Sequence, residues 1–300
     1  MSVLYTCIAS GGIRGYFSYR ILRYISKTIG SYSQGKHGGF IGVSAGAIIA
    51  ALCALDLFNE LTDDKCQTLL KNVLSLSWPH SLKSSRKYDI LYDLFGDRLM
   101  GEAIVPLYII ATTTNGHPTV FDSTDSKYAS LRIVDIVHAS SAIPIIMKPV
   151  KVGKSMYIDG GVTSASPCTL GYFIAKSRGI QESNIHILSI GTNINTTIRQ
   201  SNDDTTLKKS SVRQKIMQNV SLFSFQNIST YFGSSDILYN TFVQHLLQKQ
   251  YLKIHSVNIQ CDPLDINHID ILYKHASLIY LQNVFQIFLF LQSFVYKQIH

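Results

Sequence analysis

The stretch IGVSAGA, residues 41–47, decides the fold because it sets a Gly-x-Ser-x-Gly pattern between two apolar segments. Residues 40–43 favour a short strand, and residues 45–57 favour a buried helix. A strand, a sharp turn and a helix form the setting of a nucleophile elbow, in which small neighbours leave a strained serine accessible. The helix N-terminus also favours an oxyanion at this point. Ser44 is therefore either a nucleophile or a small residue in a tight turn.

Beyond this stretch, strand-like apolar runs alternate with segments of helical period, which is typical of an α/β sheet with crossover helices. We expect strands over residues 3–9, 40–43, 105–111, 118–121, 150–158, 185–190 and 251–259, and helices over 15–29, 45–57, 131–138 and 167–176. Residues 1–195 would form a core, and residues 196–300 a mainly helical part packed on it. The polar segment 193–211 predicts a mobile loop, either a plain solvent loop or a lid.

Composition restricts the class of protein. With 300 residues, 46% of them hydrophobic and 15% charged, the chain can bury a substantial core. Its five cysteines are scattered without CxxC pairs, which indicates neither a disulfide framework nor a zinc site. The apolar N-terminus runs directly into Gly11 and Gly12, so we interpret it as a buried strand rather than a signal peptide. These features predict a protein of a reducing compartment, cytoplasmic or peripheral at membranes, although secretion without a signal stays open.

Two features bear on membranes and on other partners. The apolar segment 276–296 is broken by polar residues and predicts a terminal helix, either buried or lying at a lipid interface, rather than a membrane span. The net charge is +8, and the first 55 residues contain basic residues but no acid. A basic face attracts anionic lipid or nucleic acid. Because the sequence has no nucleic-acid-binding motif, lipid is the favoured partner.

The sequence around and before Ser44 argues against two classes of protein. Only one strand and one helix fit before Ser44, whereas an ordinary α/β-hydrolase has several strands there. His37-Gly38-Gly39 imitates the oxyanion motif of that fold, but a polar turn before the strand explains it better. The stretch SGGIRG, residues 10–15, ends the first expected strand and opens a helix, so its backbone N–H groups are candidates for an oxyanion hole. A dinucleotide fingerprint is disfavoured, since no acid follows before Asp56.

Taken together, SGGIRG at residues 10–15, GVSAG at 42–46 and YIDGGV at 157–162 resemble the patatin-like phospholipase family. The segments over residues 88–97, 111–121, 139–144 and 187–192 are similar to further family motifs, so the resemblance covers nearly the whole chain. It departs from the family where Ser10 replaces the first loop glycine, where Ala9 replaces the preceding Asp, and where Ala165-Ser166-Pro167 replaces Asn-Asn-Pro. Backbone donation survives the loop changes.

The resemblance implies a three-layer α/β fold with a mostly parallel sheet, helices on both faces and the elbow after the second strand. It implies a Ser-Asp dyad, so Ser44 would be the nucleophile and Asp159 the base, with none of the ten histidines needed. The oxyanion hole would be formed by Gly11, Gly12 and Ile13, and the supporting residues would be Arg14, Gly15, Gly42, Gly46 and Gly160. Arg14 would either bind a lipid phosphate or, as the family favours, tie the loop to the body of the protein.

The implied function is a serine-dependent lipid acyl hydrolase of phospholipase A type, acting on phospholipids or lysophospholipids through an acyl-Ser44 intermediate. It would need no metal and no cofactor. Two alternatives remain open: a catalytically silent lipid-binding member, and a thioesterase or acyltransferase that uses the same dyad. Activation by a partner protein is compatible with the family and leaves no signal in the sequence.

Overall fold

The computed structural model describes residues 2–29, 37–60, 84–144, 147–164, 166–192, 237–256 and 269–299. One eight-stranded sheet runs through them in the order β5-β6-β3-β2-β1-β7-β8, and β4 pairs with β3 off this path. The strands are β1 (Val3–Ile8), β2 (His37–Val43), β3 (Leu107–Thr113), β4 (Pro118–Asp122), β5 (Val150–Val152), β6 (Ser155–Asp159), β7 (Ile185–Thr192) and β8 (Tyr251–Ser256). The five strands from β3 to β8 along this order are parallel.

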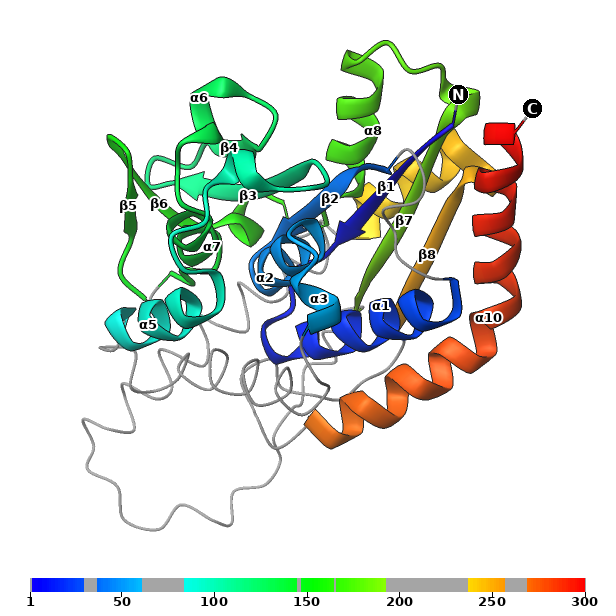
Figure 1. Ribbon diagram of the computed structural model, residues 1–300, viewed down its shortest axis with the longest axis horizontal. Coiled ribbons are helices and arrows are strands. Elements are labelled where there is room, and N and C mark those ends of the chain that lie inside the picture. Colours follow the sequence, from blue (N-terminus) through cyan, green and yellow to red (C-terminus); the bar gives the residue numbers. More distant parts are fainter. Residues whose placement is uncertain are drawn as a thin grey trace.

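Helices cover the sheet on both faces (Figure 1). They are α1 (Gly15–Ile29), α2 (Ala45–Ala54), α3 (Leu57–Glu60), α5 (Ser84–Phe95), α6 (Ser126–Ala129), α7 (Ile133–Ser140), α8 (Cys168–Ser177), α10 (Ile269–Ile299) and a helix over residues 237–247. Alternation along β1 explains the layers. Leu4 and Ile8 join the apolar cluster of α1, α2, α7 and α10, whereas Tyr5 and Cys7 join that of α8 and the 237–247 helix. The result is the three-layer α/β fold that the sequence predicts.

The arrangement of partners along β3 sets the position of the site. Residues 107–110 pair with β2, residues 111–113 pair with β6, and β4 pairs over residues 108–112. Because β4 occupies one edge of β3, β2 and β6 must share the other edge. β2 is parallel to β3 and β6 is antiparallel, so their carboxyl ends meet head to head between Ile110 and Ala111. Ser44 follows the end of one strand, and Asp159 ends the other.

Several expected boundaries are wrong for identifiable reasons. His37-Gly38-Gly39 is the start of β2 rather than a turn, because it pairs with Leu4 and Tyr5 of β1. Glycine is needed there, since a side chain on Gly38 or Gly39 would collide with the Tyr5 or Tyr108 ring. The strand expected over residues 150–158 is a hairpin that turns at Gly153, which has a φ of +58°. The helix α5 was not among the expected helices, although its apolar residues recur at helical spacing among charged ones.

The terminal helix α10 is longer than the expected segment 276–296, and it is more exposed than a buried helix would be. Its segment Ile269–Phe294 is long and apolar enough to cross a membrane by length and composition, and 28% of an 18-residue stretch within it is buried. One side of α10 packs on α1, where Tyr24 stacks on Tyr280 and bonds to Ser277 at 2.7 Å. The remaining side carries exposed leucine and phenylalanine side chains. The buried alternative is therefore wrong for most of this helix.

The expected division into a core over residues 1–195 and a C-terminal part over residues 196–300 stays a prediction, because the described residues stop at 192 and resume at 237. β8 lies beside β7 in the same sheet, so the described part of residues 196–300 adds a strand to the core as well as helices. The polar segment 193–211, expected to be a loop or a lid, lies outside the described residues.

Candidate active site

Ser44 lies in a strained turn between β2 and α2. Its φ is +57° and its ψ is −125°, a combination that L-residues rarely adopt and that costs about 1–3 kcal/mol. The flanking glycines make the turn possible. A side chain on Gly42 would meet the Gly46 carbonyl at 2.5 Å, and one on Gly46 would meet the carbonyls of Ile8 and Ala9. The Gly-x-Ser-x-Gly pattern is thus explained by the packing of α2 against the ends of two strands.

The structure brings Ser44 and Asp159 into direct contact. Ser44 Oγ donates a hydrogen bond of 2.7 Å to Asp159 Oδ2, and both residues are buried. The other carboxylate oxygen, Oδ1, accepts from the backbone N–H of Gly161 at 2.7 Å, at the start of a 3-10 turn over Gly160–Val162. A side chain on Gly160 would collide with the Ile110 carbonyl, so glycine is required there. These bonds fix the orientation of both carboxylate oxygens.

Burial makes the Asp159 carboxylate a stronger base than a free aspartate. Loss of hydration raises its pKa from 3.8 to about 6, and this outweighs the lowering effects of Ser44, Gly161 and the charge of Lys87. A carboxylate with a pKa of about 6 is mostly ionised at neutral pH and accepts a proton more readily than an ordinary one. This property suits general-base catalysis.

The turn at the end of α7 connects Ser44 and Asp159. Ser140 Oγ accepts from the backbone N–H of Ser44 at 3.0 Å and donates to the Ile110 carbonyl at 2.6 Å. Two residues further on, the carbonyl of Ala142 accepts from the backbone N–H of Asp159 at 2.9 Å. We refer to residues 140–142 as the bridging turn. It holds the backbone of Ser44 and of Asp159 at once, so the distance between them depends on its position.

Lys87 of α5 contacts the bridging turn. Its buried ammonium donates to the Ser141 carbonyl at 2.6 Å, to Ser141 Oγ at 2.7 Å and to the Met147 sulfur at 3.4 Å. Burial lowers the pKa of Lys87 to about 7, while the negative charge of Asp159 acts in the opposite direction. A buried lysine is costly unless it is paired, and here the Nζ group donates to Ser141 and Met147.

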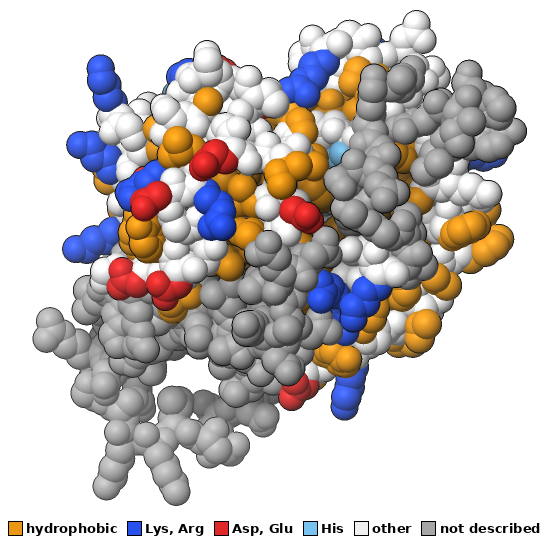
Figure 2. Space-filling view, in the orientation of Figure 1, with side chains coloured by type: hydrophobic (Ala, Val, Ile, Leu, Met, Phe, Trp, Pro, Cys, Tyr) orange, Lys and Arg blue, Asp and Glu red, His pale blue; other side chains and the backbone are white. Residues whose placement is uncertain are grey.

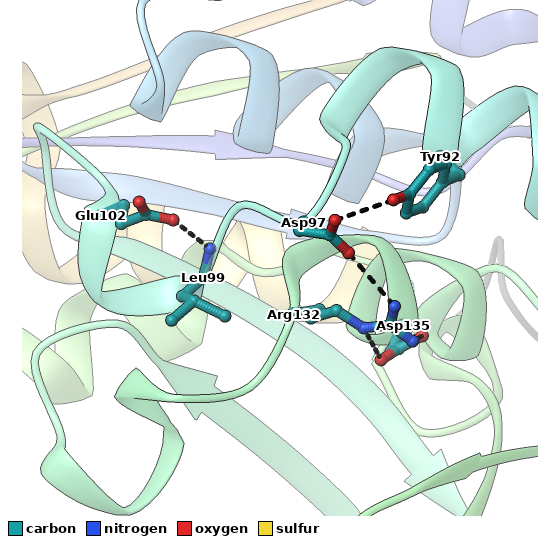
Figure 3. Close-up of polar contacts among 6 residues, drawn as sticks. All are labelled: Tyr92, Asp97, Leu99, Glu102, Arg132 and Asp135. Atoms are coloured by element: carbon teal, nitrogen blue, oxygen red, sulfur yellow. Dashed lines mark hydrogen bonds and ion pairs between the residues drawn. The ribbon is translucent and has the colours of Figure 1, made fainter.

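A polar network holds α5 against α7 (Figure 3). The Tyr92 hydroxyl donates to Asp97 at 2.8 Å, and Arg132 bonds to Asp97 at 3.4 Å and to Asp135 at 2.9 Å. The same two helices also meet where the Tyr88 ring of α5 lies against His138 of α7, with ring centroids 5.5 Å apart. These contacts link the helix that carries Lys87 to the helix that ends at the bridging turn.

The glycine-rich loop lies beside the elbow. β1 pairs in parallel with β2 so that Ile8 is opposite Gly42, which brings the loop after β1 level with Ser44. A side chain on Gly15 would lie 3.0 Å from the Ala45 methyl group. The chain enters a 3-10 turn at Gly12 and then α1. The first N–H groups of such a helix have no partner within it, so those of Gly12 and Ile13 are suited to hold an anion. The roles of Gly11, Gly12 and Ile13 stay predictions.

Two other expectations concern Arg14 and the histidines. The Arg14 side chain is 7% exposed, which favours the structural role over contact with a lipid phosphate. Within the described ranges, neither Ser44 nor Asp159 has a hydrogen bond to a histidine. His138 is buried near Lys87, and loss of hydration lowers its pKa to about 3. The same ranges contain no group of three His, Cys, Asp or Glu side chains arranged to hold a metal ion.

Sequence reasoning missed Lys87 and gave the bridging turn no role. The turn was noticed only as a family-like motif. The sequence did contain a signal for the burial of Lys87. Lys87, Leu91 and Phe95 are spaced four residues apart and so share one face of α5, and Leu91 and Phe95 are fully buried. A lysine on the buried stripe of an amphipathic helix needs an explanation, and here it contacts the site.

Comparison with known proteins identifies the family of this chain. The family model described as patatin-like phospholipase matches residues 6–171, which contain Ser44, Asp159 and the glycine-rich loop. No curated protein sequence gives a significant match. Among solved structures, the chain is similar to VipD from Legionella pneumophila, with 12% identity and a TM-score of 0.43 over 93% of this chain and 66% of that one. The chain therefore spans slightly under two thirds of VipD. Since the family model covers more than half of the sequence, the chain belongs to the patatin-like phospholipase family.

Proposed function

We propose that the protein is a serine-dependent lipid acyl hydrolase of phospholipase A type, with Ser44 as nucleophile and Asp159 as base. Its family is one of lipid acyl hydrolases in general. The assignment of Ser44 as nucleophile and Asp159 as base rests on the 2.7 Å hydrogen bond from Ser44 Oγ to Asp159 Oδ2 in a strained elbow. A serine hydroxyl bonded to a carboxylate that is fixed by a second bond has the geometry of an activated nucleophile.

The reaction follows two acyl-transfer steps. Ser44 Oγ attacks the ester carbonyl carbon while its proton passes to Asp159 Oδ2. Backbone N–H groups of Gly11, Gly12 and Ile13 stabilise the negative charge that develops on the carbonyl oxygen. The tetrahedral intermediate collapses, the alcohol leaves with the proton held by Asp159, and an acyl-Ser44 ester remains. Water then attacks this ester, Asp159 accepts its proton, and the fatty acid is released as Ser44 regains a proton.

The raised pKa of Asp159 supports its role as base. An exposed aspartate with a pKa near 3.9 is a weak base, whereas burial raises that of Asp159 to about 6. At the same time the bond from Ser44 and the charge of Lys87 keep the pKa from rising further. The carboxylate therefore stays ionised near pH 7 and still gains basicity from its apolar surroundings.

The exposed face of α10 supports contact with a lipid surface. The leucine and phenylalanine side chains there follow helical spacing and are 47–69% exposed: Leu278, Leu281, Phe285, Phe288 and Leu289. Figure 2 shows apolar side chains gathered along the edge of the molecule that α10 forms in Figure 1. A row of apolar side chains on one helix face inserts into the interfacial region of a bilayer, and the net charge of +8 adds attraction to anionic lipid. We propose a peripheral contact of this kind.

The test is hydrolysis of phospholipid vesicles, a lysophospholipid and a p-nitrophenyl ester by wild type, Ser44→Ala and Asp159→Ala. The proposal expects wild type to release fatty acid and both variants to lose at least about 100-fold in kcat, the usual effect of removing a nucleophile or base. Full activity of Ser44→Ala would rule out the nucleophile assignment. An inactive wild type, with and without added cell extract, would favour a silent lipid-binding member. Turnover of thioesters, or acyl transfer to an alcohol, in preference to ester hydrolysis would favour the thioesterase or acyltransferase alternative.

A further inference from the structure

We propose that Lys87 is a positioning residue for the Ser44–Asp159 pair: its ammonium clamps the bridging turn that holds both backbones, and it places a positive charge near the Asp159 carboxylate. The inference rests on the proposed function. It states that the buried Lys87 side chain controls both the distance between Ser44 and Asp159 and the pKa of Asp159.

The clamp follows from a chain of hydrogen bonds. Lys87 Nζ donates to the carbonyl and to the hydroxyl of Ser141, the central residue of the bridging turn. On one side of Ser141, Ser140 Oγ accepts from the Ser44 N–H, and on the other the Ala142 carbonyl accepts from the Asp159 N–H. A movement of Ser141 would therefore shift both backbones. Because Ser44 Oγ and Asp159 Oδ2 are at hydrogen-bond distance, a shift of about 1 Å would cost on the order of 100-fold in rate.

The positive charge of Lys87 acts on the Asp159 carboxylate. Among the residues that the structure describes, the Lys87 ammonium interacts electrostatically with Asp159 at the end of β6 and with His138 of α7. Burial keeps the pKa of His138 at about 3, so this ring is neutral at the pH of catalysis. Asp159 is thus the acid that the ammonium pairs with electrostatically, and the attraction lowers the carboxylate pKa against the effect of burial. Without this cation, Asp159 would become protonated at a higher pH.

A buried lysine that served packing alone would not need these partners. Leucine or methionine would fill the same position on the buried stripe of α5 without the cost of desolvating an ammonium. The three Nζ contacts account for the donors of the group, and two of them end on the residue at the centre of the bridging turn. The arrangement favours a role in the site over a role in stability.

The test compares Lys87→Met, which removes charge and donors, Lys87→Gln, which removes the charge and keeps an amide donor, and Lys87→Arg, which keeps both. Lys176→Met is the matched control, since Lys176 is exposed on α8 on the opposite face of the sheet. The readouts are the plateau of kcat for a p-nitrophenyl ester, KM, and the pH dependence of kcat/KM, with thermal unfolding to establish that each variant is folded.

We expect kcat of Lys87→Met to fall by about 10- to 100-fold with KM nearly unchanged, because a positioning defect affects the transition state. The acidic limb of kcat/KM, near pH 6 in wild type, should move to higher pH in Lys87→Met and Lys87→Gln but stay in place in Lys87→Arg and Lys176→Met. Loss of stability alone would not move the limb. Should Lys87→Met fail to fold, Lys87→Gln and Lys87→Arg give the same comparison.

An acidic limb that is unmoved in Lys87→Gln and Lys87→Met overturns the proposal, and so does a wild-type kcat plateau in Lys87→Met. The failure of this inference differs from failure of the proposed function. In the first case wild type is active, Ser44→Ala is inactive and the Lys87 variants behave as wild type. In the second, Ser44→Ala keeps the activity of wild type.

Discussion

Ser44 and Asp159 are 115 residues apart in sequence, yet Ser44 Oγ lies 2.7 Å from Asp159 Oδ2 because the strands that precede them meet end to end along one edge of β3. Each residue is also fixed through its backbone by the bridging turn. The pair is therefore held by the sheet on one side and by α7 on the other. The geometry of the site therefore depends on regular elements of the fold.

The strained backbone of Ser44 predicts a difference between two inactive variants. Ser44→Gly should be more stable than Ser44→Ala by about 1 kcal/mol, since relief of a positive φ is worth about 1–3 kcal/mol and the added freedom of the unfolded chain offsets part of it. Chemical denaturation of both variants measures the difference. Equal or reversed stabilities would show that the elbow is not strained.

The raised pKa of Asp159 predicts that the ionised carboxylate destabilises the fold. Its folded pKa is about 6 against 3.8 when unfolded, so the stability it contributes is present below pH 4 and is lost as the pH rises to about 6. Asp159→Asn, which can still accept from Gly161 and donate to Ser44, should therefore exceed wild type in unfolding free energy by roughly 1–3 kcal/mol at pH 8. Near pH 4 the difference should vanish.

Asp93→Asn is the control for this experiment, because Asp93 is an exposed acid on α5. We expect its unfolding free energy to follow that of wild type at both pH values. A stabilisation by Asp159→Asn that is the same at pH 4 and pH 8 would mean that the carboxylate charge is not the cause.

The contact of α2 with the end of β1 makes Gly46 intolerant of a side chain. In Gly46→Ala the new methyl group would meet the carbonyls of Ile8 and Ala9, so the elbow must shift. We expect a loss of about 1–3 kcal/mol in stability, the usual cost of overpacking, together with most of the activity. Gly171→Ala is the matched control: its methyl group would lie 3.1 Å from the side chains of Cys7 and Ile41, which can adjust. Equal effects of the two substitutions would contradict this interpretation.

The exposed face of α10 predicts a separation between soluble and vesicle substrates. Leu281→Asp combined with Phe285→Asp should weaken binding to anionic vesicles and hydrolysis of vesicle lipid by about tenfold or more, while hydrolysis of a p-nitrophenyl ester stays at the wild-type level. Vesicle flotation and fatty-acid release measure the two effects. Ile104→Asp is the control, since Ile104 is as exposed as Leu281 and lies far from α10 in sequence. Unchanged vesicle binding in the double variant would contradict the proposed surface.

The sequence predicts the parts of this structure that follow from local pattern. The bounds of α1 agree with the helix expected over residues 15–29, and the strand-turn-helix around Ser44 could be recognised because its apolar runs and glycines are contiguous. The pairing of β2 and β6 along one edge of β3 could not be predicted, since register depends on contacts between distant segments.

The site itself was only partly predictable. Ser44 and Asp159 stand in short motifs, so family resemblance made them candidates from the sequence alone, and the structure brings them together. Lys87 belongs to a helix whose sequence is as polar as it is apolar, and its contacts with Ser141 come from a segment 54 residues away. Similarly, the exposure of α10 could not be distinguished from burial, because an apolar composition fits a core helix and an interfacial helix equally well.

The most direct test of the account is to treat the folded protein with a fluorophosphonate, which reacts with activated serines, and to map the adduct by peptide mass spectrometry. We predict a single adduct on Ser44, absent in Ser44→Ala and formed at least about 100 times more slowly in Asp159→Asn, because the base that removes the proton is missing. Labelling of Ser44 at the wild-type rate in Asp159→Asn, or no adduct on Ser44 in wild type, would contradict the proposed dyad.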